Sequence, residues 1–248
     1  MTLRFHEISE SRHRILNPFT AEKLQLIGRI CIDERAFNVL DLCCGKAEML
    51  CTWAVDHDVS GVGVDISEVF LAAARRRVAE LSVDDRIELV HADAAKYVVE
   101  TEAQFDIVSC IGATWIGGGL VGTLELMRPR SNAGGLVVVG EPYWIDPLPE
   151  GLSVAGVEDP TEFASLAGTL DRVESAGFEL VEMALASPDD WDRYVAAQWM
   201  TVDNWLRANP DEPDANEIRE WIKDGQRSYL TAERRYLGWG VFVLRARS

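Results

Sequence analysis

The fold of this chain is decided at Val39-Leu40-Asp41-Leu42-Cys43-Cys44-Gly45-Lys46-Ala47, where an apolar run passes through an acidic residue into a loop of small residues. Residues 38–42 have the apolar character of a buried β-strand. Apolar residues recur at helical spacing over residues 46–55, so the loop is predicted to open into a helix. Small residues in such a loop let the backbone approach a ligand at a helix N-terminus.

The rest of the chain repeats this alternation of short apolar runs and amphipathic stretches. Six further strands are predicted over residues 61–64, 86–91, 105–111, 135–140, 178–185 and 240–244. Ser67 is the predicted N-cap of the helix after the second strand, and residues 160–176 are predicted as a helix closed by Gly177. The pattern predicts an α/β fold with a doubly wound, seven-stranded, mostly parallel sheet in a single domain over residues 1–248.

A helical insertion is predicted over residues 187–235, before the last strand. It carries an apolar stripe at helical spacing, with further tryptophans beside it: Val195, Trp199, Val202, Leu206, Trp191, Trp205 and Trp221. Pro210 and Pro213 divide the segment into at least two helices. Most of these aromatic residues are interpreted as packing the insertion onto the sheet, because such stripes are usually core. The alternative interpretation is a lid over a substrate pocket.

Composition argues against several classes of partner. The chain has 24 Lys and Arg against 41 Asp and Glu, and this net charge of −17 would repel a nucleic-acid backbone. Arg75-Arg76-Arg77 is interpreted as a solvated helix end. The five cysteines lack the spacing of a zinc site or of a secretory disulfide framework. The N-terminus lacks a signal peptide, and glycines interrupt the long uncharged run over residues 107–124, so no membrane partner and a cytoplasmic location are expected.

Acidic residues stand at the ends of the first three predicted strands. Asp41 lies in the first strand, Asp65 follows the second and Asp93 follows the third. Ligands of open α/β sheets bind beyond the carboxyl ends of the strands. A carboxylate after the second strand suits two ribose hydroxyls, and one after the third suits the exocyclic amine of adenine. Together they predict a nucleoside that carries a positive group rather than a pyrophosphate.

Four segments resemble, in order, the motifs of class I S-adenosylmethionine-dependent methyltransferases. They are residues 39–47, Gly63-Val64-Asp65-Ile66-Ser67, His91-Ala92-Asp93-Ala94 and Phe105-Asp106-Ile107-Val108. The resemblance covers residues 20 to 140 as motif and implies the Rossmann-like methyltransferase fold with S-adenosyl-L-methionine as cofactor. The whole chain is most similar to bacterial small-molecule methyltransferases of unassigned substrate, on Gly112-Ala113-Thr114-Trp115 and Gly140-Glu141-Pro142-Tyr143-Trp144.

The first loop departs from the family pattern Asp-x-Gly-x-Gly-x-Gly. Cys43 and Ala47 stand where the outer glycines are usual, and Gly45 alone remains. The loop is similar to the Cys-Cys-Gly-Thr-Ala-Asp loop of the menaquinone-synthesis methyltransferases. Cofactor binding is therefore expected to survive, with the vicinal cysteines acting as small side chains.

The resemblance implies a role for each motif residue in binding the cofactor. Gly45 would lie beside the methionine portion of the cofactor, in the loop that also contains Cys43. Asp41 would face the ammonium group of the cofactor. Asp65 would hold the ribose and Ile66 would pack on the adenine. The remaining predicted cofactor-binding residues are Asp93 and Ala94 at the adenine edge, and Cys110, Ile111 and Gly112 near the sulfonium. The competing interpretation of Asp65 and Asp93 is an ordinary strand-end or helix-capping role.

Acceptor-side residues are predicted on the loops after the fourth and fifth strands. Trp115 would wall the pocket, and Glu141 and Tyr143 would bind or deprotonate the acceptor. Packing of Tyr143 and capping by Glu141 are equally weighted alternatives. The resemblance also implies a helical N-terminal cover over residues 1–35, in which His13 either reaches the site or is structural. No histidine spacing suggests a metal.

The predicted function is transfer of a methyl group to a small-molecule acceptor. Two alternatives stand beside it: a protein that binds the cofactor without transferase activity, and a nicotinamide-dependent oxidoreductase. The oxidoreductase is disfavoured because the chain lacks Gly-x-Gly-x-x-Gly, whose glycines admit a pyrophosphate. The sequence specifies neither the acceptor nor the oligomeric state.

Overall fold

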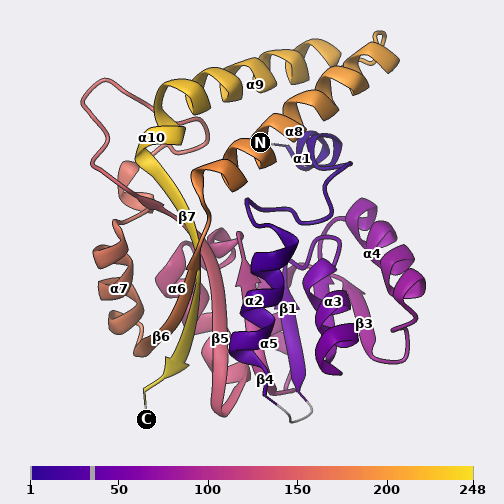
Figure 1. Ribbon diagram of the computed structural model, residues 1–248, viewed down its shortest axis with the longest axis vertical. Coiled ribbons are helices and arrows are strands. Elements are labelled where there is room, and N and C mark those ends of the chain that lie inside the picture. Colours follow the sequence, from indigo (N-terminus) through magenta and orange to yellow (C-terminus); the bar gives the residue numbers. More distant parts are fainter. Residues whose placement is uncertain (1, 34–36, 248) are drawn as a thin grey trace.

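A computed structural model describes residues 2–33 and 37–247, and a seven-stranded sheet forms its centre. Its strand order is β3-β2-β1-β4-β5-β7-β6 (Figure 1). The strands are β1 (Asn38–Leu42), β2 (Ser60–Asp65), β3 (Ile87–His91), β4 (Phe105–Ile111), β5 (Ser131–Trp144), β6 (Phe178–Leu185) and β7 (Leu237–Ala246). Strands β1 to β5 pair in parallel, and β7 runs antiparallel to both β5 and β6. The predicted doubly wound, mostly parallel sheet is confirmed, with β5 and β7 longer than predicted.

Helices cover both faces of the sheet. One face packs against α2 (Ala21–Cys31), α3 (Glu48–His57) and α4 (Glu68–Leu81), and the other against α5 (Ala94–Glu100), α6 (Leu120–Met127) and α7 (Leu166–Ser175). The side chain of Ser67 accepts a hydrogen bond from the Phe70 amide at the start of α4, which confirms the predicted N-cap. Each face has its own apolar cluster, so the sheet lies between two cores.

The helix predicted over residues 160–176 is shorter than expected. Residues Pro160–Glu162 form an isolated 3₁₀ turn, and the α-helix begins only after Ser165, whose side chain caps the Gly168 amide. This cap starts a new helix rather than continuing the turn, because its backbone is extended. Gly177 follows α7 with φ of 76°, as predicted for the end of the helix. Further 3₁₀ turns occupy Thr114–Gly117 and Arg128–Arg130.

Left-handed backbone recurs at every second residue of the loop between β1 and α3. Cys43, Gly45 and Ala47 have φ values of 57°, 55° and 53°. Such a conformation costs about 1–2 kcal/mol for a residue other than glycine. The two departures from the glycine pattern therefore keep the backbone conformation that glycine would favour. Cys44 anchors the loop by donating its backbone N–H to the carbonyl of Val64.

The insertion packs on both the N-terminal helix and the sheet, where Trp191 lies against the apolar clusters that contain Trp239 and Trp144. It comprises α8 (Pro188–Ala208), α9 (Ala215–Ser228), a π-helical turn (Tyr229–Glu233) and α10 (Arg234–Tyr236). Figure 1 shows α8 and α9 lying with α1 (Leu3–Ser9) at one end of the sheet. The apolar cluster between these helices contains Phe5, Val202 and Ile218, with Ile8, Trp205, Leu206, Trp221 and Ile222 around them. Packing is thus the role of much of the stripe, with α1 as a partner beside the predicted sheet.

A buried polar network ties the N-terminal segment to α8. Glu10 is fully buried, and its Oε1 accepts hydrogen bonds from the Tyr194 hydroxyl at 2.6 Å and from Gln198 at 2.5 Å. His13 Nε2 lies 3.1 Å from the carbonyl oxygen of Tyr194. Buried carboxylates are stable only when they are hydrogen-bonded in this way. The network fixes residues 10–13 beneath the insertion.

Ile218 tests whether this packing holds the insertion in place. Its side chain is fully buried in the cluster shared by α1, α8 and α9. We expect Ile218→Ala to lower the free energy of unfolding by about 2–5 kcal/mol, because it leaves a cavity among close-packed neighbours. Urea denaturation measures the change. Met200→Ala on the 61%-exposed position of α8 is the control and should stay within about 0.5 kcal/mol of the parent. Equal stability of the two variants would contradict the packing.

Candidate active site

A cavity of about 840 Å³ lies where the carboxyl ends of the central strands face the N-terminal segment. Loops after β1, β2, β3 and β4 contribute to its lining, as does the segment before α2. Its volume is within the range of pockets that hold cofactors and drug-sized ligands. The cavity occupies the position at which doubly wound sheets bind nucleotides.

Most of the predicted cofactor-binding residues line this cavity. They are Asp41, Cys43, Gly45, Asp65, Ile66, Asp93, Ala94, Ile111 and Gly112. Cys110 is the exception, because its fully buried side chain lies behind the lining and contacts Cys43. Of the predicted acceptor-side residues, Trp115 lines the cavity with two thirds of its surface exposed (66%).

Asp65 joins the first loop to the start of α4. Its two carboxylate oxygens accept hydrogen bonds from the backbone amides of Gly45 and Ser67, each at 2.8 Å. The side chain is buried, and loss of hydration raises its pKa while these backbone bonds lower it. Each carboxylate oxygen keeps a second acceptor position. Asp65 can therefore hold the loop and accept hydrogen bonds from ligand hydroxyls at once.

Asp41 is a buried carboxyl at the bottom of the same cavity. The Ser109 hydroxyl lies 2.7 Å from its Oδ1. Burial raises the pKa of Asp41 to about 7, against the opposing effect of the Ser109 hydrogen bond, and the charge of Asp65 raises it further. A cation placed at this carboxyl would favour its ionised form.

Asp93 has a capping role at the cavity wall. Its Oδ1 accepts hydrogen bonds from the amides of Ala95 and Lys96 at 2.9 and 3.2 Å, as the N-cap of α5. The helix-capping interpretation is therefore correct for this oxygen. Within residues 2–33 and 37–247, no hydrogen bond reaches its Oδ2. This second oxygen stays available on an exposed side chain that lines the cavity.

Glu141 and Tyr143 do not line the cavity, contrary to the expectation that they contact an acceptor directly. Side chains alternate along β5, so both residues share a face with Val139, which packs in the core beneath α6 and α7. Glu141 Oε1 is buried without a hydrogen-bond partner among the described residues. Burial raises the pKa of Glu141 to about 7, against a hydrogen bond from Thr114. Tyr143 packs so closely on Gly238 that a Cβ there would lie 2.3 Å from its ring.

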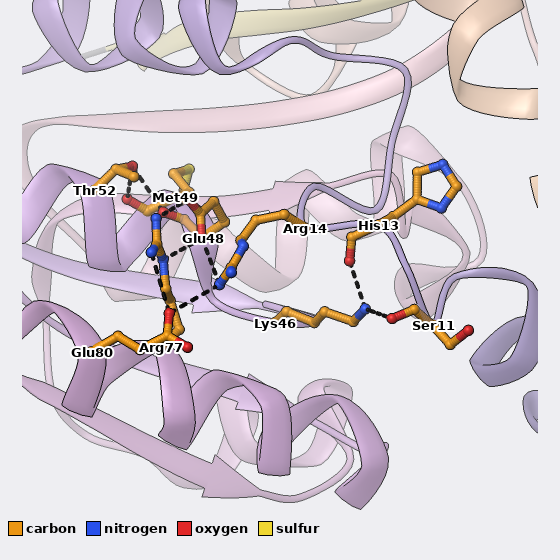
Figure 2. Close-up of polar contacts among 9 residues, drawn as sticks. All are labelled: Ser11, His13, Arg14, Lys46, Glu48, Met49, Thr52, Arg77 and Glu80. Carbon is orange, nitrogen blue, oxygen red and sulfur yellow. Dashed lines mark hydrogen bonds and ion pairs between the residues drawn. The ribbon is translucent and has the colours of Figure 1, made fainter. Parts of the chain in front are cut away.

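Sequence reasoning missed Lys46 as a structural centre of the site. Its ammonium donates to the backbone carbonyls of Glu10, Ser11 and His13 at 2.7, 3.0 and 2.6 Å. Figure 2 shows it reaching from the loop to the N-terminal segment. One signal was available: a cation beside a helix N-terminus opposes the helix dipole, so it needs partners elsewhere.

Residues of the N-terminal segment line the cavity. Thr2, Leu3 and His6 line it from α1 and its N-cap, and residues 14–17 line it farther along the chain. Residues 1, 34 and 35 of the predicted cover lie outside the described residues. His13 is structural, since its ring contacts Tyr194 and Glu10 rather than the cavity.

Among residues 2–33 and 37–247, no three His, Cys, Asp or Glu side chains are grouped to hold a metal ion. The five cysteines are free thiols. No helix in the described part of the chain has the length and apolarity needed to cross a membrane.

Comparison with known proteins identifies the family. Residues 39–121 match the family described as "Methyltransferase domain". The Escherichia coli (strain K12) protein YjhP, described as uncharacterized, is 44% identical over 246 residues, 98% of each chain. Its X-ray structure superposes with a TM-score of 0.93 over 98% of this chain and 100% of that chain.

Two further relatives have been crystallised with a product form of the cofactor. The S-adenosylmethionine-dependent methyltransferase from Geobacter sulfurreducens, in complex with S-adenosyl-L-homocysteine, is 43% identical, covers 99% of both chains and has a TM-score of 0.93. The enzyme from Thiobacillus denitrificans, in the same complex, is 42% identical over 100% of this chain and 99% of that chain, with a TM-score of 0.92. The chain therefore has the Rossmann-like methyltransferase fold and belongs to the family of S-adenosylmethionine-dependent methyltransferases.

Proposed function

We propose that this protein binds S-adenosyl-L-methionine and transfers its methyl group to a small-molecule acceptor. The observation that carries the proposal is the convergence of Asp41, Asp65 and Asp93 on one cavity of about 840 Å³. Family membership supports the reaction type and counts against a nicotinamide-dependent oxidoreductase. The proposed acceptor is small because the cofactor and the acceptor must share the cavity.

The residues present fit the cofactor. Gly45 has left-handed backbone, and a Cβ on it would lie 2.6 Å from Leu16 Cδ1, so any larger residue would narrow the cavity. Asp65 holds the ribose in this proposal, with Ile66 and Ala94 beside the adenine and the Asp93 Oδ2 at its edge. In the same proposal the carboxyl group of Asp41 contacts the ammonium group of the cofactor. The other predicted contacts are Cys43 and Gly112 on the lining, with Cys110 supporting Cys43 from behind.

Alignment and exclusion of water are the main catalytic tasks left to the chain. The bound cofactor supplies a methyl group on a sulfonium, which already contains a good leaving group. Trp115 and the turn that carries it form the wall nearest Gly112, and we assign the acceptor to this side. Glu141 is proposed as a positioning residue for that turn, through its hydrogen bond with Thr114. Tyr143 is proposed to pack against β7 rather than to act as a base.

The insertion over residues 187–235 is proposed as a cover that is held closed through the N-terminal segment. Its helix α8 contacts the segment through Tyr194 and Gln198, and the segment in turn lines the cavity. Closure of this kind excludes water from a reacting centre. A cytoplasmic location and the lack of a nucleic-acid partner stay predictions from composition.

Calorimetric titration with S-adenosyl-L-homocysteine tests cofactor binding. We expect a Kd of roughly 1–100 μM for the parent protein, a typical scale for enzyme ligands, and no binding of NAD. Asp65→Asn should raise the Kd about tenfold or more, because a hydrogen bond to a charged group is worth about 1.5–3 kcal/mol. Asp85→Asn, on a side chain that is 79% exposed, is the matched control. Binding of NAD without binding of S-adenosyl-L-homocysteine would contradict the proposal.

A separate prediction concerns how pH affects ligand binding through Asp41. Its pKa of about 7 is raised above the usual value, so at pH 7 about half of the molecules carry the proton before binding. A cationic ligand favours the ionised form, so binding should release about half a proton at pH 7, none at pH 9, and strengthen as the pH rises through 7. Titrations in buffers of different ionisation enthalpy measure the release.

Asp41→Asn is the control for this proton release. The variant should show no buffer-dependent heat from this position at any pH. A release of the same size in the variant would show that another group, such as the ligand's own amine, is responsible, and would contradict the role of Asp41.

A further inference from the structure

Both acidic and basic side chains line the cavity. The carboxyls of Asp41, Asp65 and Asp93 line one part of it. Among the Lys and Arg side chains of the described residues, two line it, Arg14 and Lys46. Burial lowers the pKa of Lys46, the charge of Glu10 raises it, and the charge of Arg14 lowers it further. In a chain of net charge −17, this is a local site of positive charge.

All three N–H donors of the Lys46 ammonium group are already hydrogen-bonded within the protein. An ammonium group has three N–H donors, and the three carbonyls of Glu10, Ser11 and His13 lie 2.6 to 3.0 Å from its Nζ. A ligand could bond to it only by displacing the N-terminal segment. Lys46 therefore contributes its charge to the cavity but no free donor.

Arg14 is differently placed, because within residues 2–33 and 37–247 its side chain forms two ion pairs but no hydrogen bond. Its side chain is 50% exposed, and the carboxylate oxygens nearest its Nη1 belong to Glu80 at 3.6 Å and Glu48 at 3.8 Å, beyond hydrogen-bond distance. Glu48 is bound by Arg77 instead, through two hydrogen bonds of 2.7 and 2.9 Å. Figure 2 shows the Arg14 side chain extended between Lys46 and the Arg77–Glu48 pair.

The N-terminus of α3 reinforces this positive region. No side chain caps it, and its N-cap residue Ala47 lies in the lining loop between β1 and α3. Uncapped N–H groups at a helix N-terminus attract an anion. Glu48, in the first turn, is ion-paired with Arg77, which also pairs with Glu80.

We infer that Arg14 binds the methionine carboxylate of the cofactor. This inference rests on the proposed function, because the ligand it anchors is S-adenosyl-L-methionine. The carboxylate is the anionic group of that ligand, and a guanidinium can hold it through two parallel hydrogen bonds. The ammonium group then faces Asp41, and the ribose faces Asp65. Arg14 is thus a cofactor-positioning residue that the N-terminal segment supplies.

Two ligands separate this role from a general effect on folding. S-Adenosyl-L-homocysteine contains the amino-acid carboxylate, whereas 5′-methylthioadenosine has the same nucleoside and thioether without it. Calorimetric titration of both ligands is carried out on the parent protein, Arg14→Gln, Arg14→Lys and Arg12→Gln. Arg12 is the matched control, because it is exposed on the same segment and does not line the cavity.

Arg14→Gln should raise the Kd for S-adenosyl-L-homocysteine about tenfold or more and leave the Kd for 5′-methylthioadenosine within about twofold. Arg14→Lys keeps the charge but loses the two-pronged geometry, so a smaller, equally selective loss is expected. It also provides the comparison should Arg14→Gln fail to fold. Arg12→Gln should bind both ligands as the parent does.

Two results would overturn the inference, and they are distinguishable. If the parent binds both ligands and the Arg14 variants weaken both equally or neither, Arg14 does not hold the carboxylate, and the proposed function stands. If the parent binds neither ligand, the proposed function fails and the inference fails with it.

Discussion

The ammonium group of Lys46 is the constraint on which the site depends. It extends from the loop after β1 and donates to three backbone carbonyls of residues 10–13, so the N-terminal segment is held directly above the loop. Backbone carbonyls that accept from a charged donor are bound more strongly than those in neutral pairs. Once the segment is fixed, Leu16 covers Gly45 and Glu10 presents its carboxylate to α8. The insertion thus depends on a residue of the first βα loop, far away in sequence.

The same loop shows how a motif can change its residues and keep its geometry. Cys43 and Ala47 adopt the left-handed backbone that glycine would adopt without strain. The surroundings must compensate for the strain, and two contacts do so: the Gly45 amide bonds to Asp65, and the Cys44 amide bonds to Val64.

The strands were predictable because their signal is local, whereas the cover and the insertion depend on contacts between distant segments. Strands 105–111 and 178–185 match the structure residue for residue, since a glycine adjoins each run, Gly112 after the first and Gly177 before the second. Nothing local shows that the tryptophan stripe of α8 meets Phe5 of α1. Glu141 does not line the cavity, and the alternation of side chains along β5 explains why. Counting by twos from the apolar Val139 would have turned its side chain to the core beneath α6 and α7, away from the cavity.

Charge separation inside the cavity then determines how a zwitterionic nucleoside can lie in it. Reversal of the ligand would place its carboxylate near Asp65 or Asp93, a costly like-charge contact in a partly buried site, and would leave the uncharged adenine beside Lys46. One orientation satisfies all of these groups, with the nucleoside over the ends of β2 and β3 and the amino-acid portion near α3. The lining then left for an acceptor lies between Gly112 and Trp115, where no Lys, Arg, Asp or Glu among the described residues reaches the lining. An acceptor that is uncharged at the reacting end suits this wall, because a charged group there would lose hydration without gaining a partner.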